Sequence, residues 1–214
     1  MSKTFVSEVS LRQYGVSMGN REELLAGAKR CLVEKGYAHT TARDIASASG
    51  VSLAAIGYHF GSKDALMNQA VYELIGEWGE ELQSALTAEG ALDGDMLKRF
   101  ESIMGRTIES FGGPGRGLWA AQVELVSLMD HNEELRRFLT GVQGVATEGM
   151  AEIFLGMDPA QDPESTRLAG FVLHTMFIGL MVRWFIDAKQ VPSAHELAEG
   201  MKIVAERMLA GHDA

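Results

Sequence analysis

The sequence has little of what is typical of a secreted or disulfide-stabilised protein. Cys31 is its only cysteine, so no disulfide can form within the chain, which fits a reducing cytosol. We interpret Cys31 as a buried apolar residue rather than a redox sensor, since no second thiol could resolve an oxidised one. Residues 1–20 lack the apolar segment of a secretory signal. We expect residues 1–19 to form a flexible N-terminal arm.

Signatures of sheets, membrane spans and catalytic sites are also missing. No segment alternates with period two, so no sheet is predicted. The uncharged segment 168–182 has 15 residues and spans about 22 Å as a helix, short of a hydrocarbon core of roughly 30 Å. A buried helix is expected there, and no membrane partner. No Ser-His-Asp order, metal-ligand spacing or carboxylate pair stands out, and the GGPGRG turn at 112–117 lacks the strand and Lys-Ser/Thr of a phosphate loop. The sequence predicts no cofactor and no metal site.

Charge is distributed unevenly along the chain. The net charge is -10, yet residues 1–70 hold eight Lys or Arg against six Asp or Glu, whereas residues 71–214 hold 11 against 23. The acidic excess therefore belongs to the second part. This asymmetry favours a small head that faces a polyanion and an acidic body that does not.

Residues 41–66 read TARDIASASGVSLAAIGYHFGSKDAL and indicate two short helices joined by a sharp turn. Thr41 is placed to cap the first helix, with Asp44 three residues later in the capping-box position. Gly50 permits the left-handed backbone of the turn. The second helix, 53–60, is about two turns long and needs tertiary packing to be stable. The pattern predicts a helix-turn-helix that docks in the major groove of DNA.

Apolar residues at helical spacing continue through the rest of the chain. They predict an all-α fold of about nine helices. Beyond the helix-turn-helix, the predicted helices are Arg21 to Lys35, a long helix from Ser62 past Trp78, Asp93 to Phe111, Gly117 to Asp130, Asn132 to Leu155, Pro163 to Lys189 and Ser193 to Leu209. We expect a head over residues 20–66 and a body over residues 67–214.

The chain from about Asn20 to Leu74 resembles the DNA-binding domain of the TetR (tetracycline-repressor) family of transcriptional regulators. The resemblance depends on several elements in order: Gly36 at a helix end, Thr40-Thr41, Ile45-Ala46, Gly50-Val51-Ser52, Tyr58-His59-Phe60 and Ser62-Lys63. It implies a three-helix head and a helical body that binds ligand and dimerises. It further implies a cytoplasmic repressor that a small apolar or amphipathic effector releases from a pseudo-palindromic operator. A ligand-gated activator, an adaptor and, least favoured, a small-molecule enzyme are the alternatives.

The resemblance also implies which residues contact double-stranded operator DNA. They are Thr41, Arg43, Ser52, Leu53, Ala54, Ala55, Tyr58, His59 and Lys63. Thr41 either contacts a phosphate or only caps its helix, and Arg43 either reads a guanine edge or is an ordinary surface residue. The apolar residues 53–55 either pack on thymine methyl groups or are simply helix formers. Gly57 departs from the family, because many members place a second aromatic there, and the recognition helix is expected to end near it.

The body is expected to hold the effector site. Candidate lining residues are Phe100, Met104, Trp119, Val123, Glu124, Phe171, His174 and Phe177, although each of them also fits an ordinary helical core. Glu124 lies on an otherwise apolar helix. Our hypothesis is that Glu124, together with His174, orients a cationic or hydrogen-bonding ligand, and the alternative is that Glu124 is exposed to solvent.

The last two helices are predicted to form a homodimer interface. Leu197, Met201, Val204 and Met208 make one apolar stripe, and Gly170 and Gly179 permit close backbone approach in the preceding helix. Packed against their symmetry mates, the two helices would form a four-helix bundle. Packing within one chain is the alternative.

Overall fold

The computed structural model describes residues 5–92, 95–129 and 133–210 of the chain. Over these ranges the regular secondary structure is helical, which confirms the predicted all-α class. The helices are α1 (Phe5–Lys35), α2 (Ala42–Ser49), α3 (Leu53–Phe60), α4 (Lys63–Ala88), α5 (Met96–Gly112), α6 (Arg116–Leu128), α7 (Glu133–Leu155), α8 (Pro163–Ile186) and α9 (Ala194–Ala210), with a short 3-10 helix at Ala188–Gln190.

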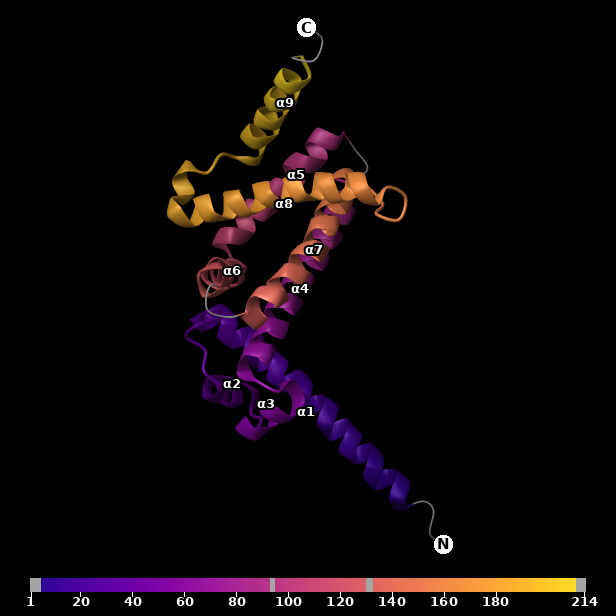
Figure 1. Ribbon diagram of the computed structural model, residues 1–214, viewed down its shortest axis with the longest axis vertical. Helices are drawn as coiled ribbons and strands as arrows, with labels where there is room; N and C mark the ends of the chain where they lie inside the picture. Colours follow the sequence, from indigo (N-terminus) through magenta and orange to yellow (C-terminus); the bar gives the residue numbers. More distant parts are fainter. Residues whose placement is uncertain (1–4, 93–94, 130–132, 211–214) are drawn as a thin grey trace.

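The helices form a head and a body that share one long element. Helices α2 and α3 pack with the second half of α1 and the beginning of α4. Helix α4 then leaves the head and runs through the body beside α7, while α8 and α9 lie at the far end of the molecule (Figure 1). Helix α6 lies between the two parts and contacts α1. The head is therefore joined to the body by α4 along the chain and by α6 through packing.

Two buried clusters make up the core. The head cluster contains Leu24, Leu32, Ile45 and Ile56 from α1 to α3, and it also includes residues of α4, α6 and α7, namely Leu66, Met67, Ala70, Val71, Ala121, Leu125 and Leu135. The body cluster surrounds Phe111, Trp119 and Phe177. Since the head core takes side chains from α6 and α7, a boundary at residue 66 does not separate two independent cores.

Several helix boundaries differ from the sequence prediction. Helix α1 begins at Phe5 rather than near Arg21, so residues 5–19 are helical and not an irregular arm. This segment contains no proline, so no backbone N–H that the helix needs is missing. Helix α8 ends at Ile186, before the predicted Lys189, and Asp187 follows in an extended conformation. The predicted helix termini at Asp93, Asp130 and Asn132 and the first four residues of the arm lie outside the described residues.

Helix α8 is longer than the uncharged segment inside it. Its 24 residues from Pro163 to Ile186 make it, by length and composition alone, the one helix in the described part of the chain that could cross a bilayer. The argument from the 15-residue segment was therefore too strict. Only 28% of the apolar window is buried within one copy of the chain. Much of the apolar surface of α8 is therefore exposed in a single copy of the chain.

Candidate functional site

The helix-turn-helix begins with a complete capping box at the start of α2. The Thr41 Oγ1 accepts a hydrogen bond from the Asp44 backbone N–H at 3.2 Å, and the Asp44 carboxylate accepts from the Thr41 backbone N–H at 2.9 Å. The Thr41 hydroxyl also donates to Asp44 Oδ2 at 2.6 Å, and Lys35 pairs with the same carboxylate. These contacts hold the pKa of Asp44 far below its ordinary value, with the Lys35 hydrogen bond as the largest cause. The capping role of Thr41 is therefore confirmed, and its phosphate contact stays a prediction.

The turn between α2 and α3 follows the sequence prediction closely. Gly50 ends α2 in the left-handed region at φ 73°, and its N–H donates to the Ala46 carbonyl. Ser52 occupies the N-cap position of α3, but its hydroxyl makes no capping hydrogen bond. Helix α3 runs through Gly57 and ends at Phe60, so the expectation that it ends near Gly57 was wrong. The buried Ile56 and the half-buried Phe60 hold α3 on the head core, which is why the glycine does not end it.

Most of the predicted DNA-contacting side chains are exposed to solvent. Thr41, Arg43, Ser52, Leu53, Ala54, Tyr58 and His59 are exposed, and the Tyr58 side chain is 80% accessible. Ala55 is half-buried against the head core, so it offers less contact surface than its neighbours. Tyr58 and His59 lie with their ring centroids 4.9 Å apart in a T-shaped arrangement. A large exposed aromatic with no core role is an unusual feature that fits contact with a partner.

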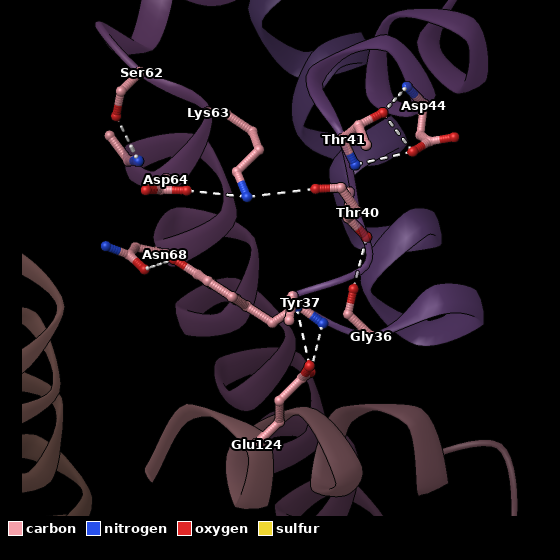
Figure 2. Close-up of polar contacts among 12 residues, drawn as sticks. Gly36, Tyr37, Thr40, Thr41, Asp44, Ser62, Lys63, Asp64, Asn68 and Glu124 are labelled. Carbon is pink, nitrogen blue, oxygen red and sulfur yellow. Dashed lines mark hydrogen bonds and ion pairs between the residues drawn. The ribbon is translucent and has the colours of Figure 1, made fainter. Parts of the chain in front are cut away.

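Lys63, the last of the predicted DNA contacts, is already engaged inside the head. Its Nζ donates to the Thr40 carbonyl at 3.3 Å and lies 3.0 Å from Asp64 Oδ1. It also lies over the ring of Tyr37, at 5.5 Å from the centroid. Figure 2 shows these contacts at the segment that joins α1 to α2. Lys63 therefore positions this segment, and a phosphate would have to compete with these partners.

Comparison with known proteins agrees with this geometry. Residues 24–70 match the family described as bacterial regulatory proteins, tetR family. The chain is 32% identical over 89 residues to the transcriptional repressor KstR2 of Rhodococcus jostii, covering 40% of this chain and 44% of KstR2. It is 47% identical over 47 residues to the repressor AcnR of Corynebacterium glutamicum, covering 22% of this chain and 25% of AcnR. The chain thus matches less than half the length of these curated relatives.

The head of the chain belongs to the TetR family. A solved structure extends the similarity in fold to the body: the multidrug binding protein EbrR, in complex with imidazole, superimposes with a TM-score of 0.60 over 84% of this chain and 92% of EbrR, at 20% identity. The predicted resemblance is therefore confirmed. In sequence, the match to this TetR-family model is confined to the head.

The body contains a cavity of about 110 Å³ between α4, α6, α7 and α8. Three aromatic side chains form its centre: Trp78 and Trp119 meet edge to face at 4.8 Å between centroids, and Phe177 lies 5.4 Å from Trp119. Its polar lining consists of Gln122, Gln143 and His174, and burial lowers the pKa of His174. Among the described residues that line it, none carries a carboxylate, ammonium or guanidinium group. The cavity therefore suits neutral, largely apolar molecules.

The structure brings together only part of the predicted effector set. Trp119, His174 and Phe177 line the cavity. Phe100, Met104 and Val123 instead pack in the body core, while Phe171 is 63% exposed on the outer face of α8. Helical spacing marks such residues as apolar but does not tell which face of a helix meets a cavity. Sequence reasoning missed Ile75, Trp78, Gln122 and Val126 as lining residues. Of these, Gln122 carried a signal as a polar residue on an apolar helix.

Glu124 does not lie where the sequence analysis placed it. Its Oε2 accepts a hydrogen bond from the Tyr37 backbone N–H at 2.8 Å, and its Oε1 accepts from the Ala38 N–H at 3.1 Å (Figure 2). His174 instead lines the cavity, with its Nδ1 3.5 Å from the Thr147 hydroxyl. The hypothesis of a Glu124–His174 pair was therefore wrong, because Glu124 is bound to the head and does not line the cavity that His174 lines.

Gly170 also serves a different purpose from the predicted one. A Cβ at Gly170 would lie 2.0 Å from the Thr147 carbonyl oxygen, so the glycine permits α8 to pack on α7 within the chain. Gly179, by contrast, has no neighbouring atom within 4 Å of such a Cβ. Around it on α8 lie the exposed apolar side chains Leu168, Phe171, Val172, Val182 and Ile186. On α9, Leu197 and Met201 pack on the body core, whereas Val204 and Met208 are exposed.

Proposed function

We propose that this protein is a ligand-responsive transcriptional repressor that binds a pseudo-palindromic operator as a homodimer and is released by a small apolar effector. The observation that carries the proposal is the path of α4. Lys63 and Leu66 at its beginning belong to the head, and Ile75 and Trp78, three turns later, line the cavity. A ligand that moves α4 at Trp78 would therefore also move the head.

On the DNA side, we propose that α3 enters the major groove, with Leu53 and Ala54 close to the bases and Tyr58 and His59 near the phosphates. Arg43, exposed on α2, is the best candidate for a hydrogen-bonded base contact, because its planar guanidinium matches guanine O6 and N7. The recognition surface has few other polar side chains. Specificity should therefore also depend on thymine methyl groups and on DNA shape. The repressor names of KstR2 and AcnR support repression rather than activation.

On the effector side, we propose that the cavity takes a small neutral molecule. Its volume of about 110 Å³ is smaller than the roughly 300–1,000 Å³ of typical ligand sites, so a larger effector would have to displace a wall helix. A groove of about 740 Å³ shares Ile75, Trp78, Ala146 and Met150 with the cavity. This groove offers a path of entry from the surface.

We propose that the exposed faces of α8 and α9 pair with the same faces of a second copy. Leu168, Phe171, Val172, Val182 and Ile186 follow one another at helical spacing on α8, and Val204 and Met208 extend the apolar surface on α9. A homodimer would place two recognition helices on one face of the DNA. This pairing, rather than a bilayer, would cover α8, in keeping with a DNA-binding protein of the cytoplasm.

The test begins with selection of genomic DNA fragments by the purified protein, followed by footprinting of the retained fragments. We expect two protected half-sites one or more helical turns apart and an affinity that falls steeply with salt. Arg43→Ala should weaken binding by about 5- to 150-fold, whereas Arg137→Ala, an exposed arginine on α7, should not. An affinity that is independent of salt would contradict the proposal.

A reporter gene placed behind the footprint decides between repression and activation. A repressor lowers expression until 1-naphthol, a neutral planar aromatic alcohol used as probe for the cavity, restores it. Expression that requires both the protein and the probe would instead indicate a ligand-gated activator.

A further inference from the structure

We infer that Glu124 is the positioning residue that fastens α6, a wall of the effector cavity, to the segment before the helix-turn-helix. The inference rests on the proposed function, because it concerns how the cavity would control DNA binding. It adds to the path along α4 a direct contact with the segment that immediately precedes the helix-turn-helix.

The carboxylate of Glu124 holds the chain just after the end of α1. Gly36 ends this helix with φ 85°, and the next two N–H groups, of Tyr37 and Ala38, point at the two carboxylate oxygens at 2.8 and 3.1 Å (Figure 2). Hydrogen bonds to an ionised acceptor are roughly twice as strong as neutral ones. A Cβ on Gly36 would lie 3.1 Å from Glu124 Oε2, so the glycine leaves the space that the carboxylate occupies.

The same face of α6 is packed on α1 along two helical turns. At Gly117 a Cβ would lie 2.5 Å from the Val33 carbonyl oxygen and 2.7 Å from the Val33 Cα, so the two backbones are in direct contact. Ala121, one turn later, is 1% exposed in the head core. Residues 117, 121 and 124 follow one another at spacings of four and three, which places them on one face. This face fastens α6 to the head.

The opposite face of α6 forms a wall of the cavity. Trp119, Gln122, Val126 and Met129 line it, again at spacings of three and four. An effector that is larger than the present cavity has to push on such a wall. Because α6 is a rigid helix of 13 residues, displacement of its cavity face also displaces Glu124.

The segment held by Glu124 is in turn connected to the DNA-binding helices. The Tyr37 hydroxyl donates to Asn68 Oδ1 on α4 at 2.7 Å, and Thr40 Oγ1 donates to the Gly36 carbonyl at 2.7 Å. Thr41, the next residue, caps α2. A shift of Tyr37 and Ala38 therefore reaches the start of α2 within three residues.

The first arm of the test measures amide hydrogen exchange at Tyr37 and Ala38 by NMR in the full-length protein. Glu124→Ala should speed exchange at both amides at least about 10-fold, with no change at a core amide such as that of Ala151. Glu124→Gln keeps one acceptor oxygen, so its exchange rates at Tyr37 and Ala38 should lie between those of the wild type and those of Glu124→Ala. Glu148→Ala, which removes an exposed carboxylate from α7, is the matched control. Unchanged exchange at Tyr37 and Ala38 in Glu124→Ala overturns the inference.

The second arm measures coupling, as the ratio of operator Kd with and without 1-naphthol. Binding of 1-naphthol is followed through the fluorescence of Trp78 and Trp119, which line the cavity. Glu124→Ala should bind 1-naphthol as the wild-type protein does, yet its coupling ratio should fall at least about 5-fold towards one. If Glu124→Ala keeps the coupling ratio of the wild-type protein, the inference is overturned. If Glu124 only stabilised the fold, the substitution would also change the affinity for 1-naphthol.

The two arms also separate this inference from the function on which it rests. If the wild-type protein binds no operator, or if 1-naphthol does not release it, the proposed function fails in that respect. The exchange measurement needs neither DNA nor probe, so it still decides whether Glu124 docks α6 on the head.

Discussion

The buried hydrogen bond between Tyr37 and Asn68 allows a sharp test of how the segment before α2 is held. The two side chains are 4% and 5% exposed, and the phenol oxygen lies 2.7 Å from Asn68 Oδ1. Tyr37→Phe removes only the hydroxyl. The ring remains, and with it the stacking of the Lys63 ammonium over its face. The substitution therefore isolates the hydrogen bond from the packing around it.

We expect Tyr37→Phe to lower the free energy of unfolding by about 1–3 kcal/mol, because Asn68 Oδ1 loses its donor in a buried place. This corresponds to roughly 5- to 150-fold in the folding equilibrium. Tyr72 lies on α4, four residues after Asn68, and is 44% exposed. Tyr72→Phe should change stability by less than about 0.5 kcal/mol and serves as the matched control.

The assay is urea unfolding followed by tryptophan fluorescence at one fixed protomer concentration, since association affects apparent stability. A double-mutant cycle with Asn68→Leu then measures the coupling between the two side chains. In the double mutant both polar partners are removed, so no buried acceptor remains unsatisfied. It should therefore regain most of the free energy of unfolding that Tyr37→Phe loses. If Tyr37→Phe is as stable as Tyr72→Phe, the hydrogen bond does not hold this segment and the reasoning is refuted.

Three further predictions concern the recognition helix, the dimer face and the capping box. Gly57→Ala should stabilise the head by up to about 1 kcal/mol, because the position is helical and no atom lies within 4 Å of the new Cβ; a lower melting temperature would contradict this. Val172→Glu, on the exposed face of α8, should convert the dimer to a monomer in analytical ultracentrifugation without loss of helical circular dichroism, and an unchanged mass would refute the proposed interface. The lowered pKa of Asp44 means that its contacts contribute stability above its ordinary pKa of 3.8 and lose it as the pH falls towards the folded-state pKa. The stability difference between wild type and Asp44→Asn should therefore shrink from about pH 6 to about pH 3, and a constant difference would show that Lys35 and Asp44 do not interact.

The helix-turn-helix could be predicted from the sequence because its determinants are local. A capping pair three residues apart, Thr41 and Asp44, and a glycine at the turn, Gly50, act within one or two turns of backbone. Ser52 shows the limit of this reasoning, since its position is that of a cap but its hydroxyl is not used. Gly57 shows the same limit, because the helix continues through this residue of low helix propensity when the packing of Ile56 stabilises it.

The effector cavity could be predicted only in its composition. Apolar spacing identified Trp119 and Phe177 correctly as inward-facing residues, and it selected Phe100 and Met104 on equal grounds. Which of them meets empty space depends on how α4, α6, α7 and α8 cross. Phe171 was misplaced for a related reason: an apolar residue on a helix is equally compatible with a core and with an interface.

By itself, the sequence determined the class of fold, the family of the head and the position of its turn, since these depend on spacings of three and four residues along one chain. The tertiary structure decided what Glu124 does. Two amides that lie 87 and 86 positions away along the chain supply its partners, and no local pattern announces them. It also decided that Gly117 and Gly170 serve close packing within the chain rather than between copies. Contacts of this kind depend on the three-dimensional path of the backbone, and helical periodicity carries no information about that path.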